Sequence, residues 1–587
     1  MAADRPIQVA THQKVADREL EDKLGASAIL EAKQATDDEH AQTLLQALRE
    51  NRRAVFWSVM ISMSIIMEGY DTILMGNFYA YPEFKQKFGD YYPDVGEYQV
   101  NGPWQVGLSM ASTVGSIFGG LINGHFASRY GYRWVMIIAM GILNCFLFVV
   151  VFAPNRGVLL AGQVLCGLCW GVFATLAPSY ASEVCPTNLR GYLTTYVNLC
   201  WATGQLIASG VLNGCLNIHG EMGYKIPFAI QWLWPTPLMV VAFLAPESPW
   251  YLVRRERLED ARKSIVRLSG SKSDEQISAQ LAMMLHTNKV EAEVTKGTTY
   301  LDCFRGTDLR RTEIVCVTLM GQILSGSSFA YTPTFFFKSA GMDVKNSFSL
   351  GLGATGMAFV GTVVSWWLLS YFGRRTIYVT GAGILSAILY VIGILDVSVG
   401  EKALWPMGGL CLFWLFTYSL TIGPLAVSIR IMTLSLSILT EEDATNILAV
   451  QYHFRNFVHP TPAFVCGLGA VLVSAHQHRV PGVEPIHGGK WHIFPLDGTP
   501  PANNITNEQS PVEWNWRGKC GFFWGSTAFL VFLWAYFRLP EIKGRTYEEI
   551  DILFTNKVSA RRFAGTHVDA YAEAHHTDVH YDESKKG

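Results

Sequence analysis

Charged residues are scarce in this chain. Asp, Glu, Lys and Arg make up 16% of its 587 residues, against a usual share of roughly 25% in soluble proteins. This shortage argues against a soluble protein of several domains, whose surfaces would need many more charges. The net charge is only −2, so the composition gives no reason to expect a nucleic-acid partner.

The chain also shows no recognisable signal peptide. Residues 1–50 are polar and mixed in charge, so we expect the first apolar segment to direct its own insertion into the membrane.

Metal-binding and catalytic patterns are missing as well. Most of the eleven cysteines lie inside apolar runs, where a free cysteine packs as a small hydrophobic residue. Cys166 and Cys169 form a C-x-x-C pair, but no second pair of ligands accompanies them. The polar segments offer no combination of nucleophile and base. We therefore predict no metal, no cofactor and no enzymatic activity.

Long apolar runs are what the chain has in abundance. A bilayer core about 30 Å thick is crossed by a helix of about 20 apolar residues, and in lipid only a helix or a closed barrel satisfies the backbone. The sequence predicts an all-α membrane protein with twelve transmembrane helices, six on each side of a polar stretch. The predicted spans are 55–81, 104–126, 134–153, 157–182, 192–214, 226–245, 314–337, 348–372, 376–395, 403–429, a weak one at 461–475 that needs 444–460, and 520–537.

The distribution of charge divides the chain and orients it. We expect an N-terminal tail (1–53), a six-helix bundle (54–246), a linker of amphipathic helices (247–311), a second bundle (312–538) and a C-terminal tail (539–587). Lys and Arg concentrate in alternate loops, so the positive-inside rule places both termini and the linker in the cytoplasm.

A short repeat relates the two bundles. Gly131, between Arg129 and Arg133, matches Gly373 before Arg374 and Arg375, 242 residues later. The same basic turn therefore follows the second helix of each half. Such a repeat predicts pseudo-symmetric bundles with substrate bound near the midplane between them.

Several motifs resemble the major facilitator superfamily, and within it the sugar porter branch. The stretches that carry this resemblance are PSYASEVCP at 178–186, PESPWYL at 246–252, QILSG at 322–326 and PEIKGRT at 540–546. MEGYDT at 67–72 and WNWRGK at 514–519 are most similar to the fungal α-glucoside (maltose permease type) proton symporters.

This resemblance implies proton-coupled import of an α-glucoside disaccharide such as maltose, by alternating access in the plasma membrane. The partners would be the sugar, protons and the lipid bilayer; the oligomeric state stays open. Three alternatives also stay open: a hexose transporter of the same branch, a transporter-like sugar receptor and a non-transporting paralogue.

Glu68 and Asp71 are the only carboxylates inside the predicted spans. A spacing of three residues places them on one face of a helix, and a carboxylate at that depth marks a functional path by default. We predict that they couple transport to protons. Asp71 also matches the first-helix Asp of the sugar porters.

The resemblance also indicates the sugar contacts. Gln205 and Gln322 match amides that contact hexose, and Gln163 stands where many proton-coupled relatives carry Arg. With Ser328 they form our set of substrate-binding candidates. Ser328, Ile323 and Ile422 replace an Asn, a Gln and a Trp of some relatives. These differences argue against a plain glucose pocket and favour a different or larger substrate, such as a disaccharide.

Charged residues at the cytoplasmic helix ends are expected to close the inner gate through ion pairs that break when the site opens inward. The gating candidates are Arg129, Arg133, Glu183, Arg190, Glu247, Arg374 and Arg375.

Residues 428–513 do not follow the family pattern. Helix eleven is poor there, and a polar, proline-rich segment follows it. Either the gene model contains an error, such as a frameshift or a retained intron, or this is a divergent loop.

Overall fold

The computed structural model describes residues 44–93, 97–270, 273–295, 306–327, 343–399, 404–433, 520–543, 545, 547–567 and 580–581. Ser328, most of the atypical stretch 428–513 and the predicted span 461–475 lie outside the described residues.

Helices dominate the first half and the linker that follows it. Those of the first half are α3 (Leu44–Glu50), α4 (Arg52–Ser62), α5 (Ile65–Phe78), α6 (Pro82–Phe88), α7 (Gly102–Tyr130), α8 (Tyr132–Val151), α9 (Arg156–Val184), α10 (Thr187–Cys215), α11 (Met222–Ala229), η1 (Ile230–Leu233) and α12 (Pro235–Leu244). The linker contains α13 (Pro249–Arg254), α14 (Leu258–Leu268) and α15 (Asp274–Thr295).

The second half is built in the same way. It contains α16 (Gly306–Leu324), α19 (Val344–Tyr371), α20 (Arg374–Val399), α21 (Leu404–Leu420), α22 (Ile422–Thr433), α25 (Cys520–Arg538), α26 (Tyr547–Thr555) and η5 (Ala560–Gly565). Two small antiparallel sheets are the only departure from all-α structure within the described residues. They pair β1 (Asp90–Tyr92) with β2 (Glu97–Gln99), and β3 (Thr566–His567) with β4 (His580–Tyr581).

Nine helical stretches of the described chain are long and apolar enough to cross a membrane. They are Arg52–Phe78, Pro103–Tyr130, Tyr132–Val151, Arg156–Val184, Met222–Leu244, Val344–Tyr371, Arg374–Val399, Trp405–Ala426 and Cys520–Arg538. All nine fall on predicted spans. Large apolar side chains such as Ile138, Phe148 and Leu530 point outward from these helices, as lipid-facing residues do.

The buried core divides into two clusters that follow the two halves. One gathers buried residues from Ala47 to Met284 together with Phe348, and the other gathers residues from Ile314 to Phe563. The linker helices α13–α15 belong to the first cluster, whereas α26 and η5 belong to the second. The linker therefore packs as part of the N-terminal half.

Three predicted spans are interrupted rather than continuous. The first breaks between α4 and α5 at Met63 and Ser64, where the Ser64 hydroxyl donates to the Ile61 carbonyl and competes with the helix. The sixth passes through the 3-10 turn η1 just before Pro235, which has no N–H to continue a helix. The tenth breaks between α21 and α22. In the first and tenth spans the amides at the break stay bonded, Ser64 to the Ile61 carbonyl and Thr421 to the Thr417 carbonyl, so these two interruptions are local distortions of a helix.

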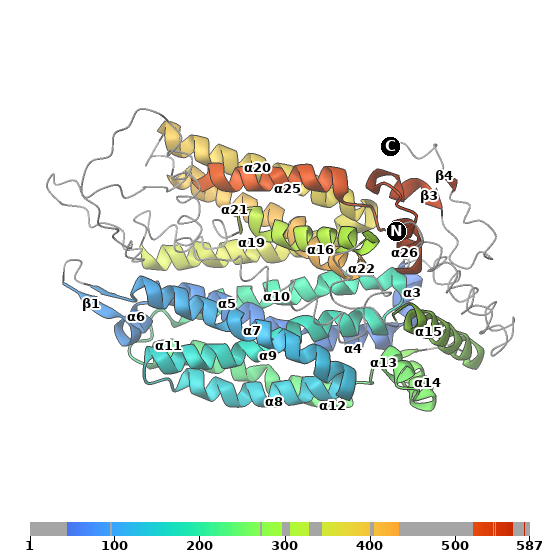
Figure 1. Ribbon diagram of the computed structural model, residues 1–587. Helices are drawn as coiled ribbons and strands as arrows, with labels where there is room; N and C mark the ends of the chain where they lie inside the picture. The colour runs from blue at the N-terminus through green and yellow to red at the C-terminus, as the bar shows by residue number, and fades with distance from the viewer. Residues whose placement is uncertain are drawn as a thin grey trace, which may run out of the picture.

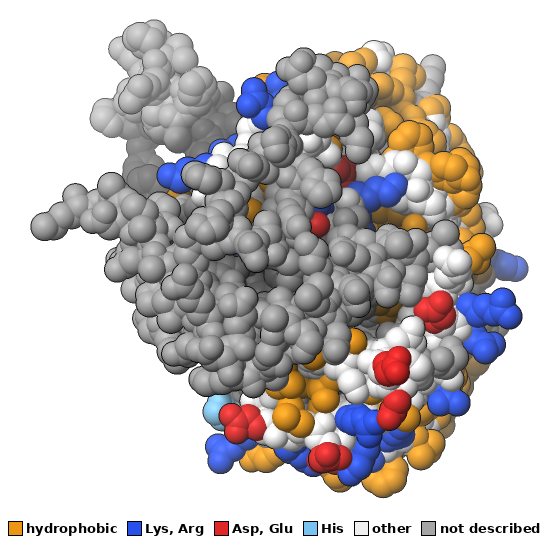
Figure 2. All heavy atoms as spheres, turned by 90° about the vertical axis from the view of Figure 1, so that its right-hand side faces the viewer, with side chains coloured by type: hydrophobic (Ala, Val, Ile, Leu, Met, Phe, Trp, Pro, Cys, Tyr) orange, Lys and Arg blue, Asp and Glu red, His pale blue; other side chains and the backbone are white. Residues whose placement is uncertain are grey.

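The two ends of the molecule differ in character. In Figure 1 the linker helices α13–α15 lie at the same end as α3 and α26, while α6 and β1 lie at the opposite end. Figure 2 looks onto the linker end and shows Lys, Arg, Asp and Glu side chains gathered there, with hydrophobic side chains along the flanks. This distribution suits a bundle that crosses a membrane with its linker in one aqueous phase.

Close packing of α5 against α10 sets the position of the carboxylates. A Cβ on Gly69 would lie 2.1 Å from the Trp201 carbonyl oxygen, and a Cβ on Gly204 would lie 2.0 Å from that of Ile66. Neither position has room for a side chain. The two backbones therefore touch at membrane depth, one residue from Glu68 and one residue from Gln205.

The two halves meet along α10 and α19, which lie side by side in the middle of Figure 1. Towards the linker end, the Tyr192 and Ser370 hydroxyls lie 3.3 Å apart, and the rings of Tyr196 and Trp366 lie 6.1 Å apart. Towards the opposite end, Tyr81 meets Phe348 edge to face.

Candidate functional site

Asp71 is buried in the N-terminal bundle between amides from two other spans. Its Oδ1 atom accepts hydrogen bonds from Gln231 Nε2 at 3.1 Å and from Gln163 Nε2 at 3.5 Å. No Lys or Arg among the described residues forms an ion pair with it. Because both donors are neutral, the carboxyl can lose or gain its charge without leaving a buried cation unpaired.

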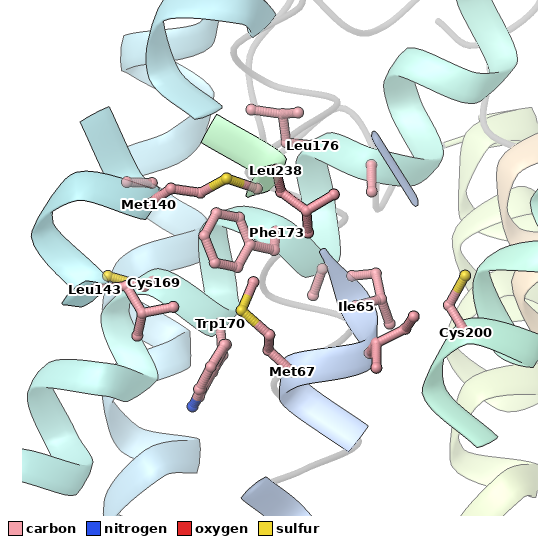
Figure 3. Packing of buried hydrophobic residues seen from close by; sticks show 14 of the residues in the cluster. Ile65, Met67, Met140, Leu143, Cys169, Trp170, Phe173, Leu176, Cys200 and Leu238 are labelled. Carbon is pink, nitrogen blue, oxygen red and sulfur yellow. The ribbon is translucent and has the colours of Figure 1, made fainter. Parts of the chain in front are cut away.

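Apolar packing and one long-range hydrogen bond hold this turn of α5 in place. Figure 3 shows Met67 of α5 packed close to Trp170 and Phe173 of α9, which are also buried. Tyr70 directly precedes Asp71, and its hydroxyl donates to the Pro227 carbonyl at 2.7 Å. The carboxylates are therefore carried by a rigid part of the bundle.

Glu68 lies one turn before Asp71 on α5 and is also buried, with 8% of its surface exposed. Its backbone carbonyl accepts a hydrogen bond from the Thr72 hydroxyl. The structure thus brings both predicted proton-coupling residues to membrane depth on one helix.

The other amide candidates lie closer to the junction of the halves. Gln205 is buried on α10, next to the Gly204 contact with α5. Gln322 is buried on α16 and donates from Nε2 to the Gly423 carbonyl at 2.7 Å, at the break between α21 and α22. Since α22 contacts both α10 and α16, the two glutamines belong to adjoining elements.

Several buried amide oxygens in this region could still accept a hydrogen bond. The Oε1 atoms of Gln163, Gln231 and Gln322 are buried and have no hydrogen-bond partner among the described residues. A buried acceptor without a donor is costly. Such acceptors suit a ligand rich in hydroxyl groups.

At the linker end, Glu247 caps the helix that follows the repeated basic turn. Its Oε1 accepts from the Tyr132 amide at 3.0 Å and its Oε2 from the Arg133 amide at 3.2 Å. Both amides are the unpaired N–H groups of the first turn of α8. Gly131 precedes them with a φ of 85°, and a Cβ there would lie 2.6 Å from Glu247 Oε2.

Glu541 caps α20 in the same manner. Its Oε1 and Oε2 accept from the amides of Arg374 at 3.0 Å and Arg375 at 3.1 Å, and a Cβ on Gly373 would meet it. In both halves a glutamate thus caps the helix that follows the repeated turn, as the repeat of Gly131 and Gly373 suggests, although only Gly131 of the two glycines has a positive φ.

Other gating candidates also find their partners within one half. Glu183 binds Arg254 of α13 at 2.7 Å and accepts from the hydroxyls of Tyr132 and Ser248. Arg374 is buried, and its Nε lies 3.4 Å from the Ser428 hydroxyl. The Arg129 carbonyl accepts from the Tyr251 hydroxyl. Arg190 lies in α10, but its side chain is outside the described part.

The environment of Glu247 shifts its protonation. Burial raises the pKa of this carboxyl from 4.5 to about 7, and the nearby charge of Glu183 acts in the same direction. The hydrogen bonds from Ser248, Arg133 and Tyr132 oppose the shift. Glu247 can therefore change its charge near neutral pH.

Sequence reasoning missed two residues of this site. Gln231 lies inside a predicted span among Pro227, Pro235 and Pro237, and an amide among helix-breaking residues was the available signal. Glu541 follows Pro540 as Glu247 follows Pro246. The Pro-Glu pair after the last span of each half was a second repeat that went unused.

Comparisons with known proteins agree with this architecture. The family model described as Sugar (and other) transporter matches residues 57–432. A maltose permease of Saccharomyces cerevisiae is 35% identical over 553 residues, which cover 93% of this chain and 83% of the relative. A general α-glucoside permease of the same species is 34% identical over 550 residues, covering 92% and 82%.

Solved structures give the same fold. The proton:xylose symporter XylE bound to 6-bromo-6-deoxy-D-glucose superposes with a TM-score of 0.67 at 17% identity, covering 86% of this chain and 100% of that one. A partially occluded inward-open form of XylE from E. coli gives a TM-score of 0.57 at 15% identity, covering 84% and 99%.

The fold is therefore that of a multi-pass transporter of the major facilitator superfamily. The chain belongs to the sugar transporter family, whose members that match it are permeases and not enzymes.

Proposed function

We propose that this protein is a proton-coupled symporter that imports an α-glucoside disaccharide such as maltose. The observation that carries the coupling part is Asp71, which is buried in the bundle and accepts hydrogen bonds from the neutral amides of Gln163 and Gln231. The disaccharide part is supported by the identity to yeast maltose and α-glucoside permeases.

In this proposal, twelve spans form two pseudo-symmetric bundles that rock about the junction of α10 and α19. Both termini and the linker face the cytoplasm of a cell whose plasma membrane holds the protein. The chain divides at 53, 246, 311 and 538, as the distribution of charge suggests. The placement of α3, the linker helices and α26 at one end supports this orientation.

The sugar binds between the halves, against Gln163, Gln205, Gln322 and Ser328. The amide oxygens of Gln163 and Gln322 have no donor within the described part of the chain. This supports the assignment, because sugar hydroxyls are donors that would satisfy them. Glu68 and Asp71 take up the proton that accompanies the sugar.

The gate lies at the linker end. In the N-terminal half, Glu247 binds the first amides of α8 and Glu183 binds Arg254. In the C-terminal half, Arg374 and Arg375 belong to the equivalent turn. Arg129, Arg133 and Arg190 complete the set. Opening inward would require the contacts of these residues with the ends of α8 and α20 to rearrange.

Uptake measurements test the proposal. The chain is expressed in cells that lack α-glucoside and hexose transport, and external pH and labelled sugar are followed after maltose, sucrose or glucose is added. We expect uptake and alkalinisation with a disaccharide and neither with glucose. Uptake of glucose with no disaccharide uptake would instead make the protein a hexose transporter, and absence of all uptake at normal surface expression would contradict a transport role.

A further inference from the structure

Two arginines converge on the end of the last span of the N-terminal half. Arg133 of α8 donates from Nη2 to the Phe243 carbonyl, and its guanidinium carbon lies 5.0 Å from the centre of the Phe243 ring. Arg267 of the linker helix α14 donates from Nη2 to the Leu244 carbonyl at 2.6 Å. One arginine thus comes from the bundle and one from a cytoplasmic segment.

The C-terminal half repeats this arrangement. Arg375 of α20 donates from Nη2 to the Tyr536 carbonyl at 2.9 Å and lies over the Tyr536 ring. Arg561 of η5 stacks on the same ring at 4.7 Å and on Phe537 at 5.1 Å. Here too, a bundle arginine and an arginine of a cytoplasmic segment meet at the end of the last span.

The charges of these four arginines are not neutralised within the described residues. None of the four pairs with a carboxylate there, whereas Arg538 binds Glu313 and Arg262 binds Asp274. A guanidinium has five N–H donors, and the contacts above use only part of that capacity.

The surroundings place both pairs at the edge of the apolar surface. Phe243 and Leu244 are each 55% exposed, and Tyr536 and Phe537 are 44% and 59% exposed. Large apolar side chains that remain exposed at the end of a span face lipid, and aromatic rings prefer the level of the headgroups. In Figure 1, α12 and α25 lie on opposite flanks of the molecule.

We propose that the pairs Arg133–Arg267 and Arg375–Arg561 each bind the phosphate headgroup of an anionic phospholipid in the leaflet at the linker end. Guanidinium groups recognise phosphate through paired hydrogen bonds, and basic residues at a membrane surface attract anionic lipid. The bound lipids would hold α14 and η5, and with them the linker and the C-terminal segment, against the membrane. Helix capping alone would require no particular lipid.

The test measures lipid binding by the full-length protein and does not depend on transport. Purified protein in detergent is titrated with palmitoyl-oleoyl phosphatidylserine or phosphatidylcholine, and bound lipids are counted by native mass spectrometry. We expect the wild type to retain two phosphatidylserine molecules in preference to phosphatidylcholine. Arg267→Gln and Arg561→Gln should each weaken one site about fivefold, and the double variant should lose the preference.

Matched variants separate charge from folding. Arg262 lies on the same helix, α14, but its charge already pairs with Asp274. Arg262→Gln should therefore leave lipid binding unchanged. Arg267→Lys with Arg561→Lys should keep the preference for phosphatidylserine. Equal retention of the two lipids by the wild type would overturn the proposal, as would equal loss of binding in the Gln and Lys double variants.

Discussion

Gln231 donates a hydrogen bond to Asp71 across 3.1 Å, from a 3-10 turn that interrupts the sixth span to a helix of the first. The two residues are 160 positions apart in the chain. A change of charge on Asp71 is therefore felt directly at a break in another span. The hydrogen bond therefore links the proposed proton site on the first span to the sixth span.

Replacing either buried carboxylate by its amide is expected to uncouple transport. Asp71→Asn and Glu68→Gln keep the size of the side chain but remove the group that takes up the proton. Sugar-driven proton entry should fall about tenfold or more, the effect of losing roughly 1.4 kcal/mol, while equilibrium exchange of sugar partly survives. External pH and labelled exchange are measured side by side. Normal proton entry in both variants would show that the coupling site lies elsewhere.

Gln231→Leu is expected to change the proton dependence of uptake. The substitution removes a donor that stabilises the charged carboxylate of Asp71, so proton binding should become more favourable. Half-maximal uptake should then need a lower proton concentration, measured from the pH profile of labelled sugar uptake. Gln105→Leu serves as the control, because Gln105 donates to the Val100 carbonyl and not to Asp71. An identical pH profile in Gln231→Leu and the wild type would show that the hydrogen bond from Gln231 does not affect proton uptake at Asp71.

Glu247 should make stability depend on pH. Its pKa in the folded protein is about 7, above the ordinary 4.5, so the folded state holds a proton that the unfolded chain has lost. Its stabilising contribution is full below about pH 4.5 and decreases as pH rises through 7. Glu247→Gln stays uncharged at every pH. The melting temperature of the variant minus that of the wild type should therefore increase from pH 5 to pH 8.

The matched control for that measurement is Glu541→Gln, at the equivalent turn of the other half. It removes the same cap from α20. A loss of capping alone would lower both melting temperatures at every pH. If the difference between Glu247→Gln and the wild type does not change with pH, Glu247 does not titrate in this range.

Gly69→Ala should destabilise the N-terminal bundle. The added methyl would lie 2.1 Å from the Trp201 carbonyl oxygen, so α5 and α10 would have to separate, at a cost of about 1–3 kcal/mol. Gly76→Ala on the same helix places its new methyl more than 4 Å from the other described residues and should be neutral or slightly stabilising. Thermal unfolding in detergent compares the two. Equal melting temperatures would mean that this contact is not tight.

The predictions that succeeded concern single segments. The long apolar runs predicted membrane helices, and each of the nine candidate spans in the described part coincides with one of them. The repeat around Gly131 and Gly373 predicted equivalent turns, which Glu247 and Glu541 cap in the same way. These features depend on a residue and its near neighbours, so the local pattern was sufficient.

What the sequence could not give is the partners of side chains. Glu183 and Arg374 were expected to form ion pairs at the cytoplasmic helix ends, but only the structure shows that Glu183 binds Arg254 and that Arg374 lies beside the Ser428 hydroxyl. The interruptions of the first and sixth spans escaped notice because mean apolarity does not record a missing hydrogen bond. Gln231 was missed because one amide hardly changes the mean apolarity of the span in which it lies.

By itself the sequence determined that this protein crosses the membrane many times, that its halves are related and that two carboxylates lie at membrane depth. These follow from hydrophobic length and from the cost of burying charge. Only the tertiary structure decided what faces those carboxylates, because the partners of Asp71 come from spans 92 and 160 residues away. Contact across such separations depends on how helices pack, here on the approach of α5 and α10 at Gly69 and Gly204.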